Sequence, residues 1–250
     1  DSLVDDYRNI VRFYRDERNQ VCAACGATFR FSEEIQKHLI MHFPEIKEAL
    51  YSRSVIIVEG ETEYGCFNLF GTTLGIRFDY YGICLINARG ESSIGKIRTL
   101  LRSFKIPVVC LYDADVREFR QQNDPCVFFT DQLCFEMDLV RAMLDHGRRR
   151  LLDEIIFNAG GMPGRATGDM LRKACHKLNK DRAEYPSCDL ASAQPRLPDS
   201  LYVYYFAWLY SNKGVVLGRL VGASLRADEI PPAFVRVIQA AGRLAKVNNR

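Results

Sequence analysis

The sequence predicts an α/β fold with a parallel-sheet core and helices on both of its faces, preceded by a small ββα unit and followed by a helical C-terminal region. Two short apolar runs, 54–58 and 107–112, are rich in β-branched residues, which is typical of parallel strands that helices cover on both faces. Helical periodicity between and after these runs indicates successive βα units. Two cysteines followed by two histidines before residue 43 indicate the small N-terminal unit.

The individual elements follow in chain order from these patterns. A charged helix over 3–15 comes first, followed by the ββα unit over 21–43 and a short helix that ends near Tyr51. The core is expected to contain strands 54–58, 82–87, 107–112 and 126–130, with helices 61–74 and 92–104 in right-handed crossovers. Six further helices are expected at 136–146, 149–158, 165–179, 201–211, 214–225 and 231–243. The segment 181–200 is polar and contains three prolines, which predicts a mobile loop.

These elements divide the chain into an N-terminal helix and linker (1–20), the ββα unit (21–43), the α/β core (44–135) and a helical part (136–250). With 250 residues, 48% of them hydrophobic, the chain has ample material for a core, and its net charge of +3 does not by itself indicate nucleic acid. The longest apolar run, 201–210, is too short to span a membrane, and no secretory signal is present. Nine cysteines, an odd number, favour free thiols in a reducing cytoplasm. The chain begins without a methionine, as expected for a fragment of a longer protein.

Four acidic residues follow the two predicted core strands. Glu59 comes directly after strand 54–58, and Glu63 lies four residues further on, one turn into the next helix, so that both can point the same way. Asp113 and Asp115 follow the second strand and share a face if that segment is extended. Ligands of open α/β sheets bind at this edge, and clustered carboxylates favour Mg²⁺ or Mn²⁺. Solvated acids at helix N-termini are the alternative, but the set as a whole favours a metal-dependent phosphodiester site.

A second motif lies before the core. Its potential ligands have the spacing C-x2-C-x12-H-x3-H of a two-cysteine, two-histidine zinc finger, and they are Cys22, Cys25, His38 and His42. Phe29 and Ile35 lie where such a finger has its apolar core, and Ser32 is a suitable helix N-cap. The alternative is two chance histidines near free cysteines. At the base-reading positions −1, 3 and 6, Phe31, Glu34 and Lys37 suit DNA poorly, which favours a structural or protein-contact finger.

The segment from Gly90 to Ile97 nearly satisfies the P-loop pattern. A P-loop needs Ser or Thr after its lysine in order to bind Mg²⁺, and Ile97 stands at that position after Lys96. We therefore expect a glycine turn before a helix here rather than a nucleotide site. Any ATPase must then lie elsewhere.

The turn Val58-Glu-Gly-x-x-Glu63, followed by Asp113-x-Asp115, resembles the TOPRIM domain of topoisomerases, primases and nucleases. The version in this chain, 49–63, is most similar to the nucleases of the OLD (overcoming lysogenisation defect) family, and the resemblance extends from about residue 46 to 242. It implies a TOPRIM-type core and a DNA endonuclease with two Mg²⁺ or Mn²⁺ ions. It also implies an ABC-type ATPase domain in the same polypeptide or on a partner, a homodimer or larger assembly, and a role in anti-phage defence.

The same resemblance transfers roles to particular residues. The metal ligands would be Glu59, Glu63, Asp113 and Asp115, with Glu136 as a less specific further acid and Asp138 less specific still. Lys213, in the block Ser211-Asn-Lys-Gly-Val, would contact the scissile phosphate or stabilise transition-state charge. None of the twelve tyrosines has a context that marks it as a strand-passage nucleophile, so hydrolysis is favoured.

Basic residues cluster in two places that could track DNA phosphates, namely Arg148, Arg149 and Arg150, and the run around Lys173. Solvated helix faces are an equally good interpretation of these clusters. Two alternatives to the nuclease stay open. One is a TOPRIM and zinc-finger module that binds nucleic acid without cutting it, and the other is a protein similar to a primase or a recombination mediator. Assays of primer synthesis and of DNA nicking distinguish the three: a primase makes primers, a nuclease nicks DNA, and a binding module does neither.

Overall fold

The computed structural model describes residues 6–16, 18–119, 123–160, 162–193 and 199–247. Its core is a parallel sheet with strand order β4-β3-β5-β6, formed by β3 (Ser54–Val58), β4 (Ile83–Asn87), β5 (Val108–Tyr112) and β6 (Val127–Phe129). The two central strands, β3 and β5, are buried along their whole length. Their apolar sequences are therefore explained by cover on both faces, and the predicted fold class is confirmed.

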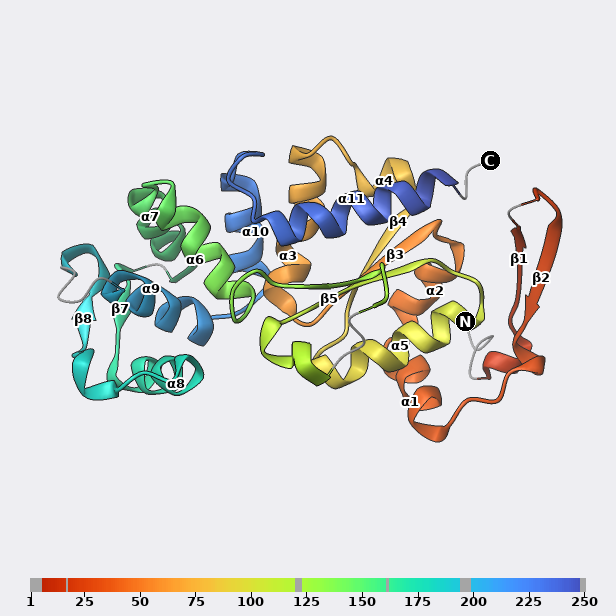
Figure 1. The fold of residues 1–250 in the computed structure, drawn as a ribbon, viewed down its shortest axis with the longest axis horizontal. Coiled ribbons are helices and arrows are strands. Elements are labelled where there is room, and N and C mark those ends of the chain that lie inside the picture. The colour runs from red at the N-terminus through yellow and green to blue at the C-terminus, as the bar shows by residue number, and fades with distance from the viewer. Residues whose placement is uncertain (1–5, 17, 120–122, 161, 194–198, 248–250) are drawn as a thin grey trace.

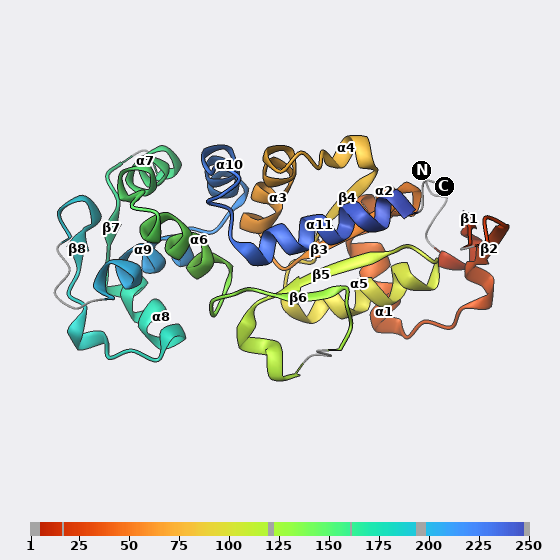
Figure 2. The ribbon, with the colours of Figure 1, turned by 45° about the horizontal axis from the view of Figure 1, so that its top comes forward.

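Alternate residues of β3 enter two separate cores (Figure 2). Ile56 and Val58 face α3 (Glu61–Thr73) and α11 (Pro232–Val247), beside the short α4 (Phe78–Tyr81). Val55 and Ile57 face α1 (Glu33–Met41), α2 (Phe43–Tyr51) and α5 (Glu91–Ser103). Because successive strand residues point to opposite faces, the run of five apolar or small residues supports both layers of helices.

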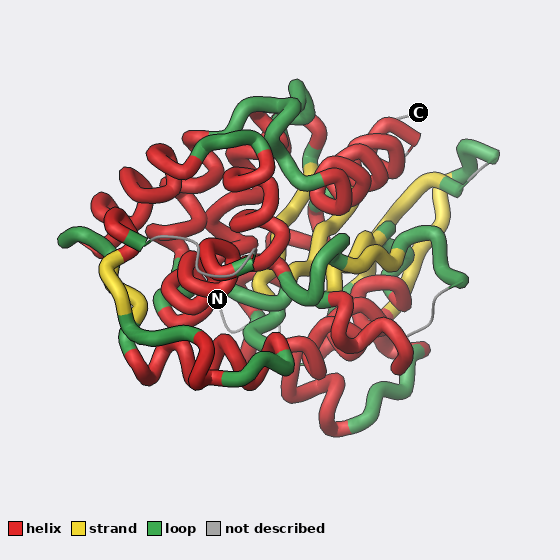
Figure 3. The backbone as a smooth tube through the Cα atoms, turned by 60° about the vertical axis from the view of Figure 1, so that its left-hand side comes forward, coloured by secondary structure: helices red, strands yellow, loops and turns green. Residues whose placement is uncertain are grey.

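The chain beyond residue 134 has two parts (Figures 1 and 3). A helical lobe contains α6 (Phe135–Asp145), α7 (Arg149–Gly160), α8 (Gly168–Leu178) and α9 (Ser200–Ser211), with the small pair β7 (Arg165–Ala166) and β8 (Cys188–Asp189). The chain then returns to the core, where α10 (Val215–Ser224) packs against α3 and α11 crosses β3 and β5. None of the helices described is long and apolar enough to cross a membrane.

The segment that the prolines predicted as a mobile loop is partly structured. It contains two 3-10 turns and β8, and it buries Tyr185 and Leu190 in the lobe. Residues 194–198 of that prediction lie outside the described part of the chain.

The predicted helix over 3–15 is wrong for the residues described. Val11–Arg15 forms β1, which pairs antiparallel with β2 (Val21–Cys25), and residues 3–5 lie outside the described part. Arg12 fixes this hairpin to the core by donating to the carbonyls of Leu50 (3.2 Å), Phe104 (3.2 Å) and Lys105 (3.1 Å). These carbonyls lie at the C-terminal ends of α2 and α5, where helix carbonyls lack partners of their own. A strand that places Arg12 there therefore satisfies groups that a helix end leaves free.

Candidate active site at the carboxyl edge of the sheet

Four predicted site acids gather at one edge of the sheet from four different elements. Glu59 follows β3 and Asp113 follows the adjacent β5, while Glu63 and Glu136 lie in the first turns of α3 and α6. Each is close enough to feel the charge of others: Glu59 and Glu136 act on Asp113, and Glu136 and Asp113 act on Glu63. The edge therefore concentrates negative charge where the topology predicted it.

Burial makes ionisation of this cluster unfavourable. Desolvation, followed by the charges of Glu59 and Glu136, raises the pKa of Asp113 to about 8. The Lys213 charge and the backbone N–H of Phe135, 3.0 Å from Asp113 Oδ1, act in the opposite direction. Desolvation also raises the pKa of Glu59, and it raises that of Glu63 well above its usual range. Buried acids of this kind stay charged only when cations compensate them.

Lys213 is a cation placed at this cluster by the chain itself. Its Nζ lies 2.9 Å from Oε1 of Glu136, a side chain that is completely buried. The other oxygen, Oε2, has no hydrogen-bond partner among the described residues. Burial lowers the pKa of Lys213, but the nearby charges of Glu136, Glu63 and Asp113 outweigh it, so that the pKa is raised and the ammonium stays charged.

Close packing of α10 on α3 places Lys213 beside these acids. A Cβ on Gly218 would lie 2.2 Å from the carbonyl oxygen of Thr62, and one on Gly65 would lie 2.5 Å from that of Val215. Glycine at both positions therefore allows the two helix backbones to touch. The backbone N–H of Gly214, directly after Lys213, donates to Oγ1 of Thr62 at 3.1 Å. Sequence reasoning missed these positions, although the glycines at 214, 218 and 222 have the four-residue spacing of one helix face.

Asp115 lies in the 3-10 segment Ala114–Phe119 and is paired differently. Its Oδ2 accepts a hydrogen bond from Nζ of Lys177, which comes from α8 in the helical lobe. The turn that carries it is held by Oγ1 of Thr130, which accepts from the N–H of Ala114 at 2.8 Å. Neither Lys177 nor Thr130 had been assigned to the site from the sequence.

Asp138, the least specific of the transferred acids, stabilises a loop. It accepts hydrogen bonds from the backbone N–H groups of Asp131 (2.9 Å) and Gln132 (2.7 Å). Burial raises its pKa to about 6.

The first basic cluster is largely committed to internal contacts. Arg148 Nη1 lies 2.5 Å from the fully buried Glu229, and Arg149 donates to the Tyr205 hydroxyl (3.1 Å) and the Leu190 carbonyl (2.7 Å). Arg148 therefore joins the lobe to the segment between α10 and α11, and Arg149 makes its contacts within the lobe, while their expected role in DNA contact stays a prediction. Arg150 is exposed. Lys173 is also exposed and pairs at 3.6 Å with Asp169 of its own helix.

The predicted zinc site is not formed by the described residues. No three His, Cys, Asp or Glu side chains among them make a group that could hold a metal ion. The linker between the two ligand pairs is anchored elsewhere, because Phe29 packs edge-on against Phe104 of the core at 4.9 Å between ring centroids. The helix α1, which contains His38 and ends just before His42, packs against α5 rather than as part of a compact finger. Phe29 and Ile35 accordingly join the core of the sheet and not a separate finger core.

The acidic edge likewise forms no complete set of metal ligands in the described part of the chain. The four acids and Asp115 lie close enough for their charges to interact, but their side chains do not converge on one point. Their chemistry nevertheless fits a divalent cation. They offer hard oxygen donors, the ionised forms of Asp113 and Glu63 are disfavoured without compensation, and Glu136 Oε2 lacks a partner among the described residues.

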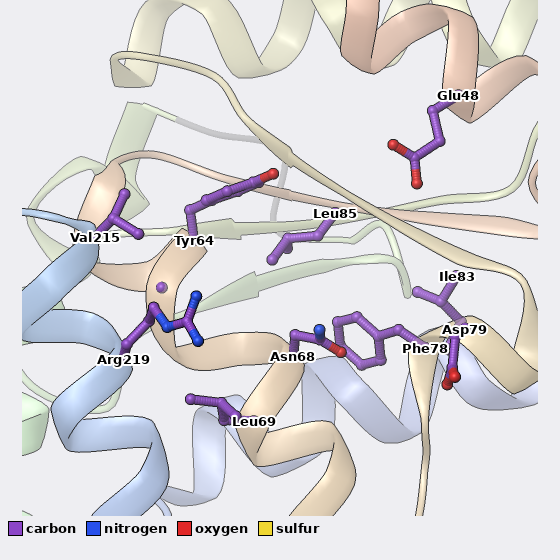
Figure 4. A pocket seen from close by; sticks show the side chains of 11 residues that line it. Glu48, Tyr64, Asn68, Leu69, Phe78, Asp79, Ile83, Leu85, Val215 and Arg219 are labelled. Atoms are coloured by element: carbon purple, nitrogen blue, oxygen red, sulfur yellow. The ribbon is translucent and has the colours of Figure 1, made fainter.

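Two surface cavities flank α3. One of about 620 Å³ lies directly beside Lys213, where the first turn of α10, Glu61 and Trp208 line it. The other, of about 400 Å³, lies between α3, the edge strand β4 and α10, with Tyr64, Asn68 and Arg219 among its lining (Figure 4). None of the predicted catalytic residues lines the second cavity. The first cavity is lined by Lys213, although none of the four site acids lines it.

Comparison with known proteins defines the class of this domain. Residues 50–115 match the family "Overcoming lysogenization defect protein-like, TOPRIM domain". The similarity to an OLD-like TOPRIM domain covers this span, which begins before β3 and ends at Asp115.

Solved structures extend the likeness to most of the chain. The C-terminal region of the Xanthomonas campestris pv. campestris OLD protein has a TM-score of 0.53 at 19% identity, over 81% of this chain and 98% of that one. The C-terminal region of the Burkholderia pseudomallei OLD protein has a TM-score of 0.50 at 16% identity, over 78% and 99%. No curated protein sequence matches the chain. At these identities the likeness shows a shared fold.

Proposed function

We propose that this chain is a metal-dependent DNA endonuclease that hydrolyses phosphodiester bonds at the acidic edge of its TOPRIM domain. One observation carries the proposal: Glu59, Glu63, Asp113 and Glu136 meet at this edge together with Lys213, and the first three of these acids lie in the span 50–115 that matches an OLD-like TOPRIM domain. Burial raises the pKa of Glu59, Glu63 and Asp113, and acids in such an environment favour a site whose charge is completed by cations. The surface beside Lys213 leaves room for a phosphate backbone.

Glu59, Glu63, Asp113 and Asp115 would hold Mg²⁺ or Mn²⁺, in keeping with two ions per site. Bound cations would supply Lewis-acid activation of water and neutralise charge on the phosphate. The side chains must rotate to converge, since they are neighbours but not a formed ligand set. Lys213 would stabilise the charge that develops on the phosphate, and Glu136 would keep its ammonium in place through their ion pair.

Arg150 and Lys173 are the members of the basic clusters best placed to contact DNA phosphates, because both are exposed. The resemblance to OLD nucleases further supports an ABC-type ATPase as a partner, on the same polypeptide or another, and a dimeric or larger assembly. It also supports a cytoplasmic role in anti-phage defence or DNA processing. These proposals concern the whole protein, because a nuclease domain alone does not determine its partners or its biological role.

A module that binds DNA without cutting it is the second candidate. The observation that favours it is the pairing of Asp115 with Lys177, which leaves one expected metal ligand engaged by a lysine. Cleavage itself separates the two candidates, since the binding module would retain DNA yet leave it intact.

The proposal is tested by incubating supercoiled plasmid with the chain in Mg²⁺, Mn²⁺ or EDTA. We expect nicked or linear product with a divalent cation only, and a loss of at least about a hundredfold in rate for Glu59→Gln and Asp113→Asn. Glu118→Gln, which alters an exposed acid three residues after Asp115, should cut like the wild type. If both site variants cut at the wild-type rate, the acidic edge is not the catalytic centre.

A further inference from the structure

Asp115 differs from the other expected metal ligands in that a lysine from the helical lobe already engages it. Nζ of Lys177 donates to Oδ2 of Asp115 across a gap of 62 residues in the chain. The pair lies at the surface, with 23% of the Lys177 side chain and 30% of the Asp115 side chain exposed. A direct, charge-assisted hydrogen bond nevertheless fixes the geometry of its two partners.

Lys177 differs from the two neighbouring lysines in the part of the molecule that its side chain contacts. Lys173, one turn earlier on α8, pairs with Asp169 of the same helix. Lys180, just beyond the end of α8, pairs with Asp199 within the lobe. Lys177 alone of these three reaches from the lobe to the sheet edge, and its charge also acts on Glu59 and Asp113. The edge thus receives one lysine from each side, Lys213 before α10 and Lys177 from α8.

A divalent cation and the Lys177 ammonium compete for the same carboxylate. The oxygen that accepts the hydrogen bond of Lys177 has a lone pair committed to it, and two positive charges a few ångströms apart repel each other. A cation that binds Asp115 must therefore displace the ammonium or accept a weaker ligand. Displacement would remove the direct contact of α8 with the carboxylate edge.

We propose that Lys177 is a positioning residue that holds Asp115 while no divalent cation is bound and is displaced from it when one binds. Cation binding is thereby linked to release of α8 from the sheet edge, so that the helical lobe senses the state of the site. This inference rests on the proposed role of the acidic edge as a cation site.

The first test is calorimetric titration of Mn²⁺ into the chain in the absence of DNA. Lys177→Gln removes the competing charge, so its Mn²⁺ affinity should rise on the order of fivefold to tenfold. Lys177→Arg keeps the charge and should bind Mn²⁺ like the wild type. Lys180→Gln is the matched control, because it also removes a lysine–aspartate pair at the end of α8 but away from the edge. Its Mn²⁺ affinity should not change.

The second test is acetylation of lysines by a small amine-reactive ester, followed by peptide mass spectrometry. In the wild type, Mn²⁺ should raise the modification rate of Lys177 severalfold and leave that of Lys180 unchanged. Asp113→Asn, which weakens the proposed cation site, should abolish the increase. This measurement needs neither cleavage nor a folded Lys177 variant.

The outcomes separate this inference from the proposed function. If the wild type binds no Mn²⁺, or if Asp113→Asn binds it equally well, the proposed cation site is wrong and the inference falls with it. If the wild type binds Mn²⁺ through Asp113 but Lys177→Gln shows equal or weaker affinity, the cation site stands and the role of Lys177 is refuted. Unchanged acetylation of Lys177 on Mn²⁺ binding refutes it as well.

Discussion

At the scale of single residues, folding raises the pKa of Asp113 far above its ordinary value. Its pKa is about 8 in the folded protein, against an ordinary value of 3.8, because it is buried beside Glu59 and Glu136. The folded protein therefore binds a proton between these pH values that the unfolded chain has released. The contribution of Asp113 to stability is fully present below about pH 4 and is lost as the pH rises through 8.

We therefore predict that the cation-free protein becomes less stable between pH 5 and pH 8, by on the order of 3–4 kcal/mol from Asp113. Asp113→Asn should reduce the fall in unfolding free energy with pH, and it should be more stable than the wild type at pH 8. Part of the fall should remain because of Glu59 and Glu63. Urea unfolding in EDTA at pH 5 and pH 8 measures the unfolding free energy of both proteins. Asp79→Asn, at an exposed site, is the control. Equal slopes in Asp113→Asn and the wild type would contradict the assigned environment of Asp113.

At the scale of elements, the contact between α3 and α10 decides where Lys213 lies. Gly218→Ala would place a Cβ 2.2 Å from the Thr62 carbonyl oxygen, so α10 would have to move away from α3. We predict a loss of about 1–3 kcal/mol in unfolding free energy. We also predict a fall in cleavage rate, because the turn with Lys213 moves with the helix. Unfolding and plasmid cleavage measured on the same variant test both effects.

Gly95→Ala is the matched control for that substitution. Gly95 lies inside α5, and a Cβ there would approach nothing closer than the Tyr112 hydroxyl at 4.0 Å. Alanine is the better helix former, so this variant should gain about 0.5–1 kcal/mol and cut normally. If Gly218→Ala behaved in the same way as Gly95→Ala, close packing of α10 would not be what positions Lys213.

Element patterns also show what the sequence could predict and what it could not. Strands β3 and β5 and the acids after them were predictable, because local apolar runs and adjacent carboxylates encode them. The hairpin strand Val11–Arg15 was mistaken for a helix, since its pairing with β2 and the docking of Arg12 on two helix ends are not local signals. The internal partners of Arg148 and Arg149 are likewise not local signals, because they lie 81 and 41 or more residues away.

At the scale of the whole molecule, the candidate site lies where the sheet, the helical lobe and the returning α10 meet. Glu59 and Asp113 come from the sheet, Glu136 and Lys177 from the lobe, and Lys213 from the turn before α10. The motif Asp113-x-Asp115 predicted both of its aspartates as site residues, but Lys177, which contacts Asp115, has no motif of its own. Its role is visible only when the lobe is folded against the sheet. The geometry of such a site depends on how the sheet, the helical lobe and the turn before α10 are placed relative to one another.

The central claim is that this meeting point is a catalytic centre and does not only bind DNA. The most direct measurement is the single-turnover rate of DNA cleavage by Lys213→Met, recorded with its Mn²⁺ affinity, DNA affinity and thermal unfolding. We predict a rate lower by about a hundredfold to a thousandfold with both affinities within a few-fold of the wild type. Lys47→Met, at an exposed lysine, should cut normally. Cleavage by folded Lys213→Met at the wild-type rate would contradict the account.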